Sequence, residues 1–265
     1  MDWFTLPVTF VFGSIIGSFL NVVVWRVPRG ESIVNPPSAC PNCGAPIAPW
    51  DNVPILSWFI LRGRCRSCGE PISARYPLVE AGTALAFTGV VLAGIVNVYP
   101  LALVPALVYL AAISITLALI DIDTFRLPNA IVLPSYPVLV ALLALASLLT
   151  GDWGAMLGAV VGGAILFLAY FAIVLIYPKG MGFGDVKLAG VLGLALGWIG
   201  WGALAVGGFS AFLVGGVFGI VLLAAGRVGR RTAIPFGPWM LVGAWIGISF
   251  GKSIWNAYLS AIGLV

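Results

Sequence analysis

Long apolar runs separated by short polar segments restrict the fold of this chain more than any other feature. A helix needs about 20 apolar residues to cross the hydrocarbon core of a bilayer. Backbone groups inside lipid must be hydrogen-bonded within the protein, so such runs form helices. The sequence predicts eight spans, the sixth of them short: Leu6–Val27, Pro77–Val96, Leu101–Ile120, Ala130–Leu149, Ala155–Tyr177, Val186–Leu196, Trp201–Ala225 and Pro235–Phe250.

The composition supports a membrane bundle, because 61% of the residues are hydrophobic and only 8% are charged. The mean hydropathy of +1.11 lies far outside the range of soluble domains. We therefore expect an all-α polytopic membrane protein of about eight transmembrane helices. The expected division is a first transmembrane helix at 1–27, a polar cytoplasmic loop at 28–76 and a seven-helix bundle at 77–265.

The placement of Lys and Arg predicts the orientation, since short cytoplasmic loops carry the excess of positive charge. An N-out, C-out arrangement leaves only Lys252 outside. The other basic residues then share the cytoplasmic side: Arg26, Arg29, Arg62, Arg64, Arg66, Arg75, Arg126, Lys179, Lys187, Arg227, Arg230 and Arg231. The net charge of +4 therefore reflects topology, and the sequence argues against a nucleic-acid partner.

The polar loop at 28–76 contains all four cysteines as two C-x-x-C pairs, Cys40 with Cys43 and Cys65 with Cys68. Two such pairs, each followed by glycine, are typical of a four-thiolate zinc site. A disulfide pairing is the alternative, and the reducing cytoplasm disfavours it. Four thiolates would fill every position of a tetrahedral zinc ion, so we expect the metal to be structural.

Two acidic segments stand at the ends of apolar runs in a chain that has no histidine. Asp121 ends the third predicted span and Asp185 begins the sixth, so both should lie at the cytoplasmic face. An ionisable residue at a membrane span indicates a functional site. Two adjacent carboxylates can share a proton, so that one activates water while the other polarises a carbonyl. Asp123 lies on a different helical face from Asp121 and should not replace it.

The sequence around each acid indicates how its side chain is presented. Pro128 should end the helix that carries Asp121. On the other side, Gly180, Gly182 and Gly184 give the backbone before Asp185 freedom to adopt positive φ. Capping of a helix end is the simpler explanation for a single acid. The matched depth of two acids favours an aspartyl hydrolase over capping alone.

At these segments the chain resembles the bacterial prepilin leader peptidases, which are aspartyl peptidases with a GxGD motif. The resemblance covers nearly the whole chain and includes GSFLNVVVWRVP, NVPILSWFILRGRCRSCGEPISARYPLVE, DIDTFRLPN and GMGFGDVKLAG. It implies a multi-pass inner-membrane enzyme that removes the basic leader of type IV prepilins or type II secretion pseudopilins. Asp121 and Asp185 match the two catalytic aspartates of the family.

The resemblance also implies a second activity, because members with the cysteine loop methylate the new N-terminal amine with S-adenosylmethionine. No glycine-rich nucleotide motif locates the methyl donor. The candidate residues, all polar or embedded in a motif on the cytoplasmic side, are Glu31, Asn52, Gly63, Arg64 and Glu80. Glu80 has an alternative role as a structural ion pair with Arg75.

Two other functional classes remain open from the residues alone. A transporter or channel could use Asp121 and Asp185 as a proton or cation relay. The cysteine loop and the position of both acids at the membrane edge disfavour that class. A structural partner in pilus assembly is the weaker alternative.

Overall fold

The computed structural model describes residues 4–178, 180–227, 229, 232 and 234–263. Over these residues the protein is helical, and the only β-type pairings found there are two isolated bridges. The expected all-α class is therefore confirmed. The chain divides into two compact units, Met1–Thr116 and Leu117–Val265.

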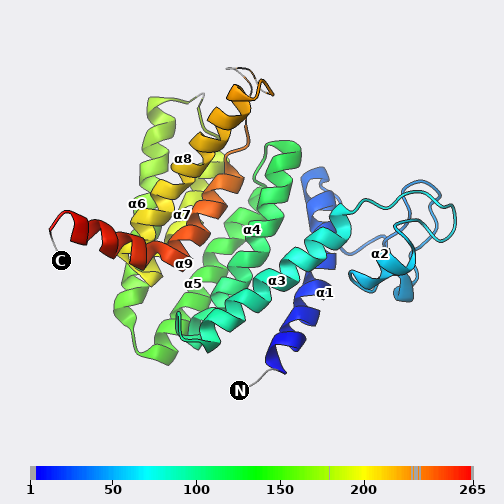
Figure 1. Ribbon diagram of the computed structural model, residues 1–265, viewed down its shortest axis with the longest axis horizontal. Helices are drawn as coiled ribbons and strands as arrows, with labels where there is room; N and C mark the ends of the chain where they lie inside the picture. Colours follow the sequence, from blue (N-terminus) through cyan, green and yellow to red (C-terminus); the bar gives the residue numbers. More distant parts are fainter. Residues whose placement is uncertain (1–3, 179, 228, 230–231, 233, 264–265) are drawn as a thin grey trace. The chain divides into compact units, whose positions relative to one another are not determined.

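A long helix occupies each predicted apolar run (Figure 1). The long helices are α1 (Thr5–Arg26), α3 (Arg75–Ile95), α4 (Val104–Thr124), α5 (Asn129–Thr150), α6 (Trp153–Ile176), α7 (Phe183–Ile199), α8 (Trp201–Ala224) and α9 (Gly237–Ala261). The short ones are η1 (Val27–Arg29), η2 (Pro49–Asp51), α2 (Leu56–Ile60) and η3 (Leu101–Leu103). The last helix extends past the predicted end at Phe250, because polar residues such as Lys252 lower hydropathy without breaking a helix.

Six of these helical segments are long and apolar enough to cross a membrane, which supports a multi-pass membrane protein. They are Thr5–Arg29, Arg75–Ile95, Leu101–Thr124, Asn129–Thr150, Trp153–Ile176 and Trp201–Ala224. The helices α7, with 17 residues, and α9 are not among the six. The count of eight spans and the N-out, C-out orientation therefore stay predictions.

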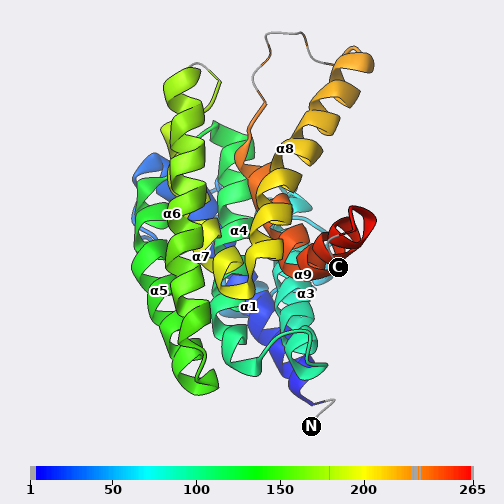
Figure 2. The same cartoon turned by 90° about the vertical axis from the view of Figure 1, so that its left-hand side faces the viewer.

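The short helix α7 lies at the centre of the second unit. It packs along α6 and also contacts α5, α8 and α9 (Figure 2). From Val186 to Trp198 every residue except Lys187 is buried. A helix that is apolar on all sides is stable when other helices surround it. The sixth predicted span, Val186–Leu196, which is short for a membrane crossing, therefore forms the core of the second unit.

Glycines allow α6 and α7 to approach closely. A Cβ atom added at Gly162 of α6 would lie 2.7 Å from the carbonyl oxygen of Gly193 on α7 and 2.8 Å from the Cα of Gly197. Small residues at such positions are the usual basis of helix packing in membranes. The pair α8 and α9 uses the same device, since a Cβ at Gly247 would lie 2.7 Å from the Cα of Gly207.

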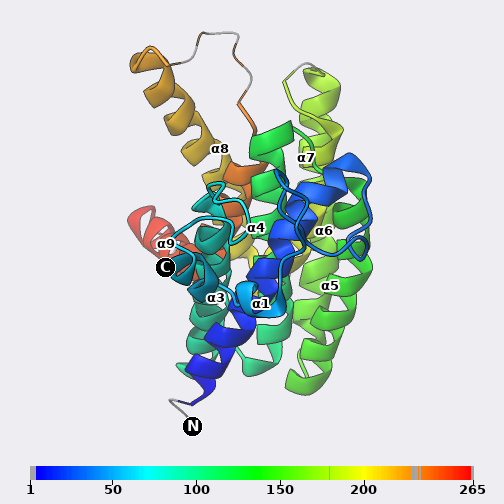
Figure 3. The ribbon, with the colours of Figure 1, turned by 90° about the vertical axis from the view of Figure 1, so that its right-hand side faces the viewer.

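In the first unit α1 packs along α3 through a similar contact (Figure 3). Added Cβ atoms at Gly13 and Gly17 would lie 2.7 Å and 2.6 Å from the Cα atoms of Ala84 and Glu80, respectively. These glycines therefore permit close helix packing. Gly216 of α8, by contrast, has no atom within 4 Å of an added Cβ.

Replacement of Gly162 by alanine should destabilise the second unit, whereas the same change at Gly216 should not. The first change forces α6 and α7 apart, and overpacking of this kind costs about 1–3 kcal/mol of unfolding free energy. The second adds a methyl group in open space, and removing a helical glycine there stabilises by up to about 1 kcal/mol. Thermal unfolding in detergent, followed by circular dichroism, measures both. Equal unfolding midpoints would show that the glycine contact is unimportant.

Candidate active site and cysteine cluster

Asp121 is buried in the last turn of α4, with 5% of its surface exposed. The helix ends three residues later, and the next residue, Phe125, adopts a left-handed φ of 53° and donates its N–H to the Asp121 carbonyl. Pro128 then precedes the first residue of α5, as the sequence predicts. This ending leaves the Asp121 side chain directed into the second unit rather than into the loop.

The Oδ2 atom of Asp121 accepts the backbone N–H of Gly237, the first residue of α9, over 3.0 Å. Any larger residue at Gly237 would meet the carboxylate, because an added Cβ would lie 2.7 Å from Oδ2. Helix N-termini favour anions, since their first N–H groups have no partner within the helix. Gly237 is not among the site residues predicted from the sequence, although the glycine and proline that open this run are a usual helix-start signal.

Asp185 is the third residue of α7 and is partly buried. Its Oδ2 accepts the N–H of Gly182 over 3.1 Å, so the side chain also caps its own helix. The expected positive φ is wrong for Gly182, which has φ −76°, and for Gly184, which is helical. Gly184 instead permits a close approach, since its added Cβ would lie 3.1 Å from the Cβ of Leu127.

The structure brings Asp121 and Asp185 close enough for their negative charges to interact. Leu127 lies between the segment at Gly184 and the segment at Gly237, which contain or adjoin the N–H groups that bind the two acids. Its side chain is next to Gly184 on one side and within 3.3 Å of an added Cβ at Gly237 on the other. Two carboxylates at short range cannot both ionise without a large cost, so such a pair tends to hold one shared proton. Asp123, by contrast, is exposed.

A second set of contacts joins the start of α5 to the start of α7. The Nζ atom of Lys187 donates to the side-chain oxygen of Asn129 over 2.9 Å. The hydroxyl of Tyr136 donates to the carbonyl of Lys187 over 2.7 Å. Because Asn129 follows the Asp121 segment and Lys187 follows Asp185, these bonds fix the two acidic segments relative to each other. None of these three residues is assigned to the site from the sequence, although Asn129 and Lys187 lie within the two acidic motifs.

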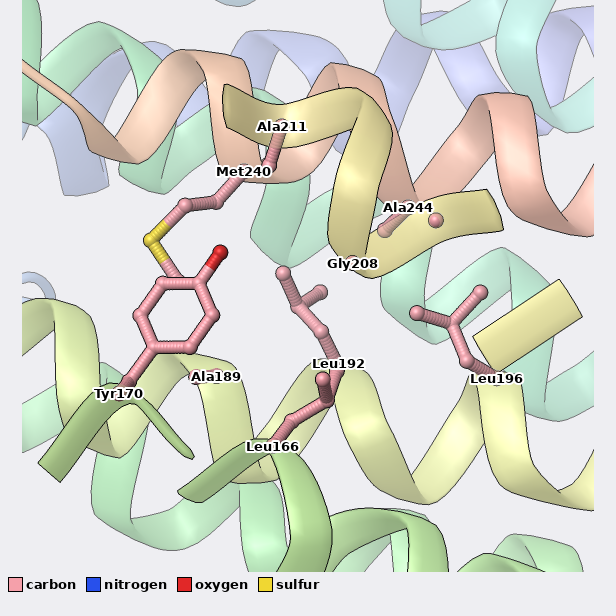
Figure 4. Close-up of a pocket in the computed structure, with 10 residues that line it drawn as sticks. Leu166, Tyr170, Ala189, Leu192, Leu196, Gly208, Ala211, Met240 and Ala244 are labelled. Atoms are coloured by element: carbon pink, nitrogen blue, oxygen red, sulfur yellow. The ribbon is translucent and has the colours of Figure 1, made fainter. Parts of the chain in front are cut away.

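Tyr170 of α6 is an aromatic residue that lies near the segments of both acids. Its ring lies 6.3 Å from the ring of Phe236, the residue before Gly237, and the charge of Asp185 acts on its hydroxyl. Tyr170 also lines a cavity between α6, α7, α8 and α9, with Leu192 and Met240 near it (Figure 4). The cavity volume is about 10 Å³, close to the minimum for one water molecule. A peptide side chain does not fit there.

The four cysteines of the first unit form one cluster. Their sulfur atoms all lie within 4.8 Å of one another, and the Sγ atoms of Cys40 and Cys68 are 3.8 Å apart. A disulfide needs about 2.05 Å, and all four cysteines are free thiols, so the disulfide alternative is not found. A group of four thiolates with this spacing is suited to a tetrahedral metal ion.

The two halves of the cluster repeat the pattern C-x-x-C-G-x-P-I, a signal that the sequence analysis missed. In each half the glycine N–H donates to the carbonyl of the first cysteine, over 2.9 Å for Gly44 and 3.0 Å for Gly69. Both glycines have a left-handed φ, 69° and 75°. Each half therefore presents its two thiols on the same tight turn.

Local charges and dipoles also stabilise the loop. The backbone N–H groups of Cys43 and Asn42 lower the pKa of Cys40 to about 7, whereas the pKa of Cys43 is raised to about 11, in part by the neighbouring thiols. Cys40 is therefore the thiol of this pair that ionises more readily. Arg66 forms a two-point ion pair with Asp51, at 2.6 Å and 2.7 Å, and its guanidinium lowers the pKa of that carboxyl. This pair joins the second cysteine turn to η2.

The candidate methyltransferase residues all belong to the first unit but have different surroundings. Glu31 and Arg64 are exposed. Gly63 has a φ of 65°, and an added Cβ there would lie 2.9 Å from the ring of Trp58. Glu80 is 9% exposed on α3 and accepts the N–H of Ile55 over 2.6 Å. The candidate Asn52 is exposed after η2.

Comparison with known proteins gives matches over most of the chain. Residues 11–93 match the bacterial peptidase A24 N-terminal domain, and residues 108–224 match the type IV leader peptidase family. A prepilin leader peptidase/N-methyltransferase of Aeromonas hydrophila is 37% identical, over 98% of this chain and 96% of that protein. The Bacillus subtilis (strain 168) protein of the same name is also 37% identical, over 96% and 98% of the two chains.

A Myxococcus xanthus protein, again a prepilin leader peptidase/N-methyltransferase, is 43% identical over 84% of this chain and 65% of its own length. No solved structure matches the chain.

The bond between Asp121 and Gly237 predicts different effects for two substitutions of this acid. Asp121→Ala leaves the buried Gly237 N–H without an acceptor, which costs about 1–3 kcal/mol. Asp121→Asn keeps a side-chain oxygen there and should remain closer to wild type in stability. Thermal unfolding in detergent compares the two variants. If alanine and asparagine unfold at the same temperature, the bond does not support the fold.

Proposed function

The chain belongs to the type IV leader peptidase family, and we propose that it removes the basic leader of type IV prepilins or type II secretion pseudopilins. The proposed catalytic residues are Asp121 and Asp185. The observation that carries this proposal is the convergence of these two carboxylates, from helix ends far apart in sequence, within one apolar unit. The chain is therefore proposed to be an aspartic endopeptidase.

In the proposed reaction one carboxylate takes a proton from water while the other, protonated, donates to the scissile carbonyl oxygen. The water oxygen attacks the carbonyl carbon as it loses this proton, which gives a tetrahedral diol. The C–N bond then breaks as the nitrogen receives the proton that the first carboxylate took from water, and a diol hydroxyl returns its proton to the other carboxylate. Gly237 supports this scheme, because its N–H fixes one Asp121 oxygen and so orients the carboxyl group. The contact of Lys187 with Asn129 supports it by holding the two segments together.

We place the reaction at the cytoplasmic face of the inner membrane, in an N-out, C-out topology of eight spans. The distribution of basic residues supports this orientation. Three of them, Lys179, Arg230 and Arg231, lie outside the described residues. The apolar helix of the substrate would lie in the bilayer, and its basic leader would remain on the cytoplasmic side. The segment 180–184 offers backbone groups to an extended peptide.

We also propose that the chain methylates the new N-terminal amine with S-adenosylmethionine as methyl donor. The names of the relatives support this second activity. The residues proposed to contact the donor are Glu31, Gly63, Arg64 and Glu80, which all belong to the unit that contains the cysteine cluster. In this proposal Cys40, Cys43, Cys65 and Cys68 bind a structural Zn²⁺ that keeps the loop folded.

Replacement of either acid by asparagine should abolish cleavage, because each carboxyl has a separate proton-transfer role. The expected loss is at least about 100-fold for Asp121→Asn and for Asp185→Asn. The matched control is Asp123→Asn, an exposed acid two residues from Asp121, which should retain part of the cleavage activity. Purified variants in detergent are mixed with a prepilin, and the product mass is followed over time.

A wild-type cleavage rate in Asp121→Asn or in Asp185→Asn would contradict the aspartyl mechanism. Loss of cleavage in a folded Asp123→Asn variant would mean that Asp123, rather than Asp121, is the catalytic acid. In the same spectra, a methyl increment on the mature N-terminus that requires S-adenosylmethionine tests the second activity. Cleavage without such an increment would support the peptidase assignment and contradict the methyltransferase assignment.

The purified chain should contain about one zinc ion, since four thiolates form one closed tetrahedral site. Cys65→Ser should lose that zinc. Asp51→Asn is the control, because it breaks the ion pair with Arg66 next to the cluster but leaves every thiol in place. Elemental analysis of protein from zinc-containing medium measures the ratio. Zinc retained in Cys65→Ser, or absent from the wild type, would contradict the assignment.

A further inference from the structure

We propose that the short helix α2 is inserted into the membrane surface, with its apolar face in contact with lipid at the Arg75 end of α3. This helix belongs to the polar loop that carries the cysteine cluster, so the proposal gives that loop a second attachment to the bilayer. It does not depend on the proposed peptidase activity. All the contacts that fix α2 lie within the first unit.

The exposed face of α2 is apolar. Leu56, Phe59 and Ile60 are spaced as neighbours on one side of a helix, and they are 59%, 64% and 71% exposed. Trp50, in the adjoining η2, is 70% exposed. In a water-soluble loop such side chains would point inward. An apolar patch that is exposed without a protein partner in its own unit indicates a contact surface.

The opposite face of α2 makes the polar contacts. The Ser57 hydroxyl donates to the Trp50 carbonyl over 3.2 Å, and the Trp58 indole N–H donates to the Ile72 carbonyl over 3.0 Å. Gly63 allows the chain to pass over the Trp58 ring, as its added Cβ would lie 2.9 Å from that ring. These bonds fix the rotation of α2, so the side chains of Leu56, Phe59 and Ile60 remain directed outward.

A contact with Glu80 sets the depth of α2. The N–H of Ile55, the residue before α2, donates to the Glu80 carboxylate over 2.6 Å. Glu80 lies five residues into α3, which begins at Arg75 and is itself a candidate span (Figure 1). At 1.5 Å per residue this is about 7–8 Å along the helix. Helices that lie in the membrane surface bury their apolar face to about 5–10 Å, which is the same depth.

The backbone before α2 is held in an uncommon conformation that maintains this contact. Ile55 has φ 65° and ψ −56°, and the Leu56 N–H donates back to the Pro54 carbonyl over 2.6 Å. Together these describe a tight γ-turn, and a β-branched residue rarely adopts it. The turn directs the Ile55 N–H toward Glu80, so the structure holds α2 against α3 rather than letting it move into water.

Charge favours lipid as the occupant of this face. Arg62 and Arg64 follow α2 directly and are exposed. Arginine beside tryptophan and aliphatic side chains is typical of the bilayer interface, where the cation meets lipid phosphates. A patch that contacted only another apolar protein surface would not need this basic border. The loop is also joined through Arg26 and Arg75 to two candidate spans, so it cannot leave the membrane surface.

The test places a photoreactive benzoylphenylalanine at Phe59 of the full-length chain in nanodiscs of phosphatidylethanolamine and phosphatidylglycerol. The matched control carries it at Pro41, which is exposed on the first cysteine turn of the same loop. After irradiation, mass spectrometry of the labelled peptide identifies what has been captured. We expect lipid adducts at position 59 in at least about tenfold excess over position 41, because only an inserted side chain meets acyl chains.

Two results would overturn the proposal. Crosslinks from position 59 to another segment of the chain would show that protein covers the face. Few or no lipid adducts at position 59, as at position 41, would show that the face is in water. A second probe at Leu56 covers the case in which the change at Phe59 prevents folding, and unchanged thermal unfolding identifies the folded variants.

Discussion

Two carboxylates converge within one apolar unit, and this convergence is the constraint around which the proposed active site is built. Asp121 and Asp185 come from the end of one helix and the start of another, and their charges interact. Such an arrangement is unfavourable without compensation. The N–H of Gly237 donates to Asp121 over 3.0 Å, and the N–H of Gly182 donates to Asp185 over 3.1 Å. The helix ends therefore hold two acids together that would otherwise separate.

Close helix packing makes this convergence possible. The central helix α7 is buried along most of its length, and glycine contacts bring it against α6. Asp185 is thereby fixed at one end of a rigid core element. The bond between Lys187 and Asn129 and the position of Leu127 fix the neighbouring segment in the same way. The small cavity beside Tyr170 leaves no room for a peptide and is not its binding site.

The helices and the main groups of residues could be predicted from the sequence, because bilayer thickness and C-x-x-C spacing are strong constraints. Each apolar run contains a helix, the four thiols form one cluster, and Asp121 and Asp185 lie near each other. The partner of Asp121 could not be predicted, since Gly237 is 116 residues away. The outward apolar face of α2 was also missed, because a helix of five residues has too little periodicity to read. The expectation of positive φ failed for Gly184 because glycine permits close approach as well as positive φ, and this helical residue lies against Leu127.

The joint action of the two acids is tested by a structure of the complex with a prepilin peptide whose scissile bond is replaced by a hydroxyl-bearing transition-state analogue. We expect this hydroxyl to lie within hydrogen-bond distance of a carboxylate oxygen from both Asp121 and Asp185. An analogue bound with its hydroxyl in contact with only one of the two acids, or with neither, would contradict it.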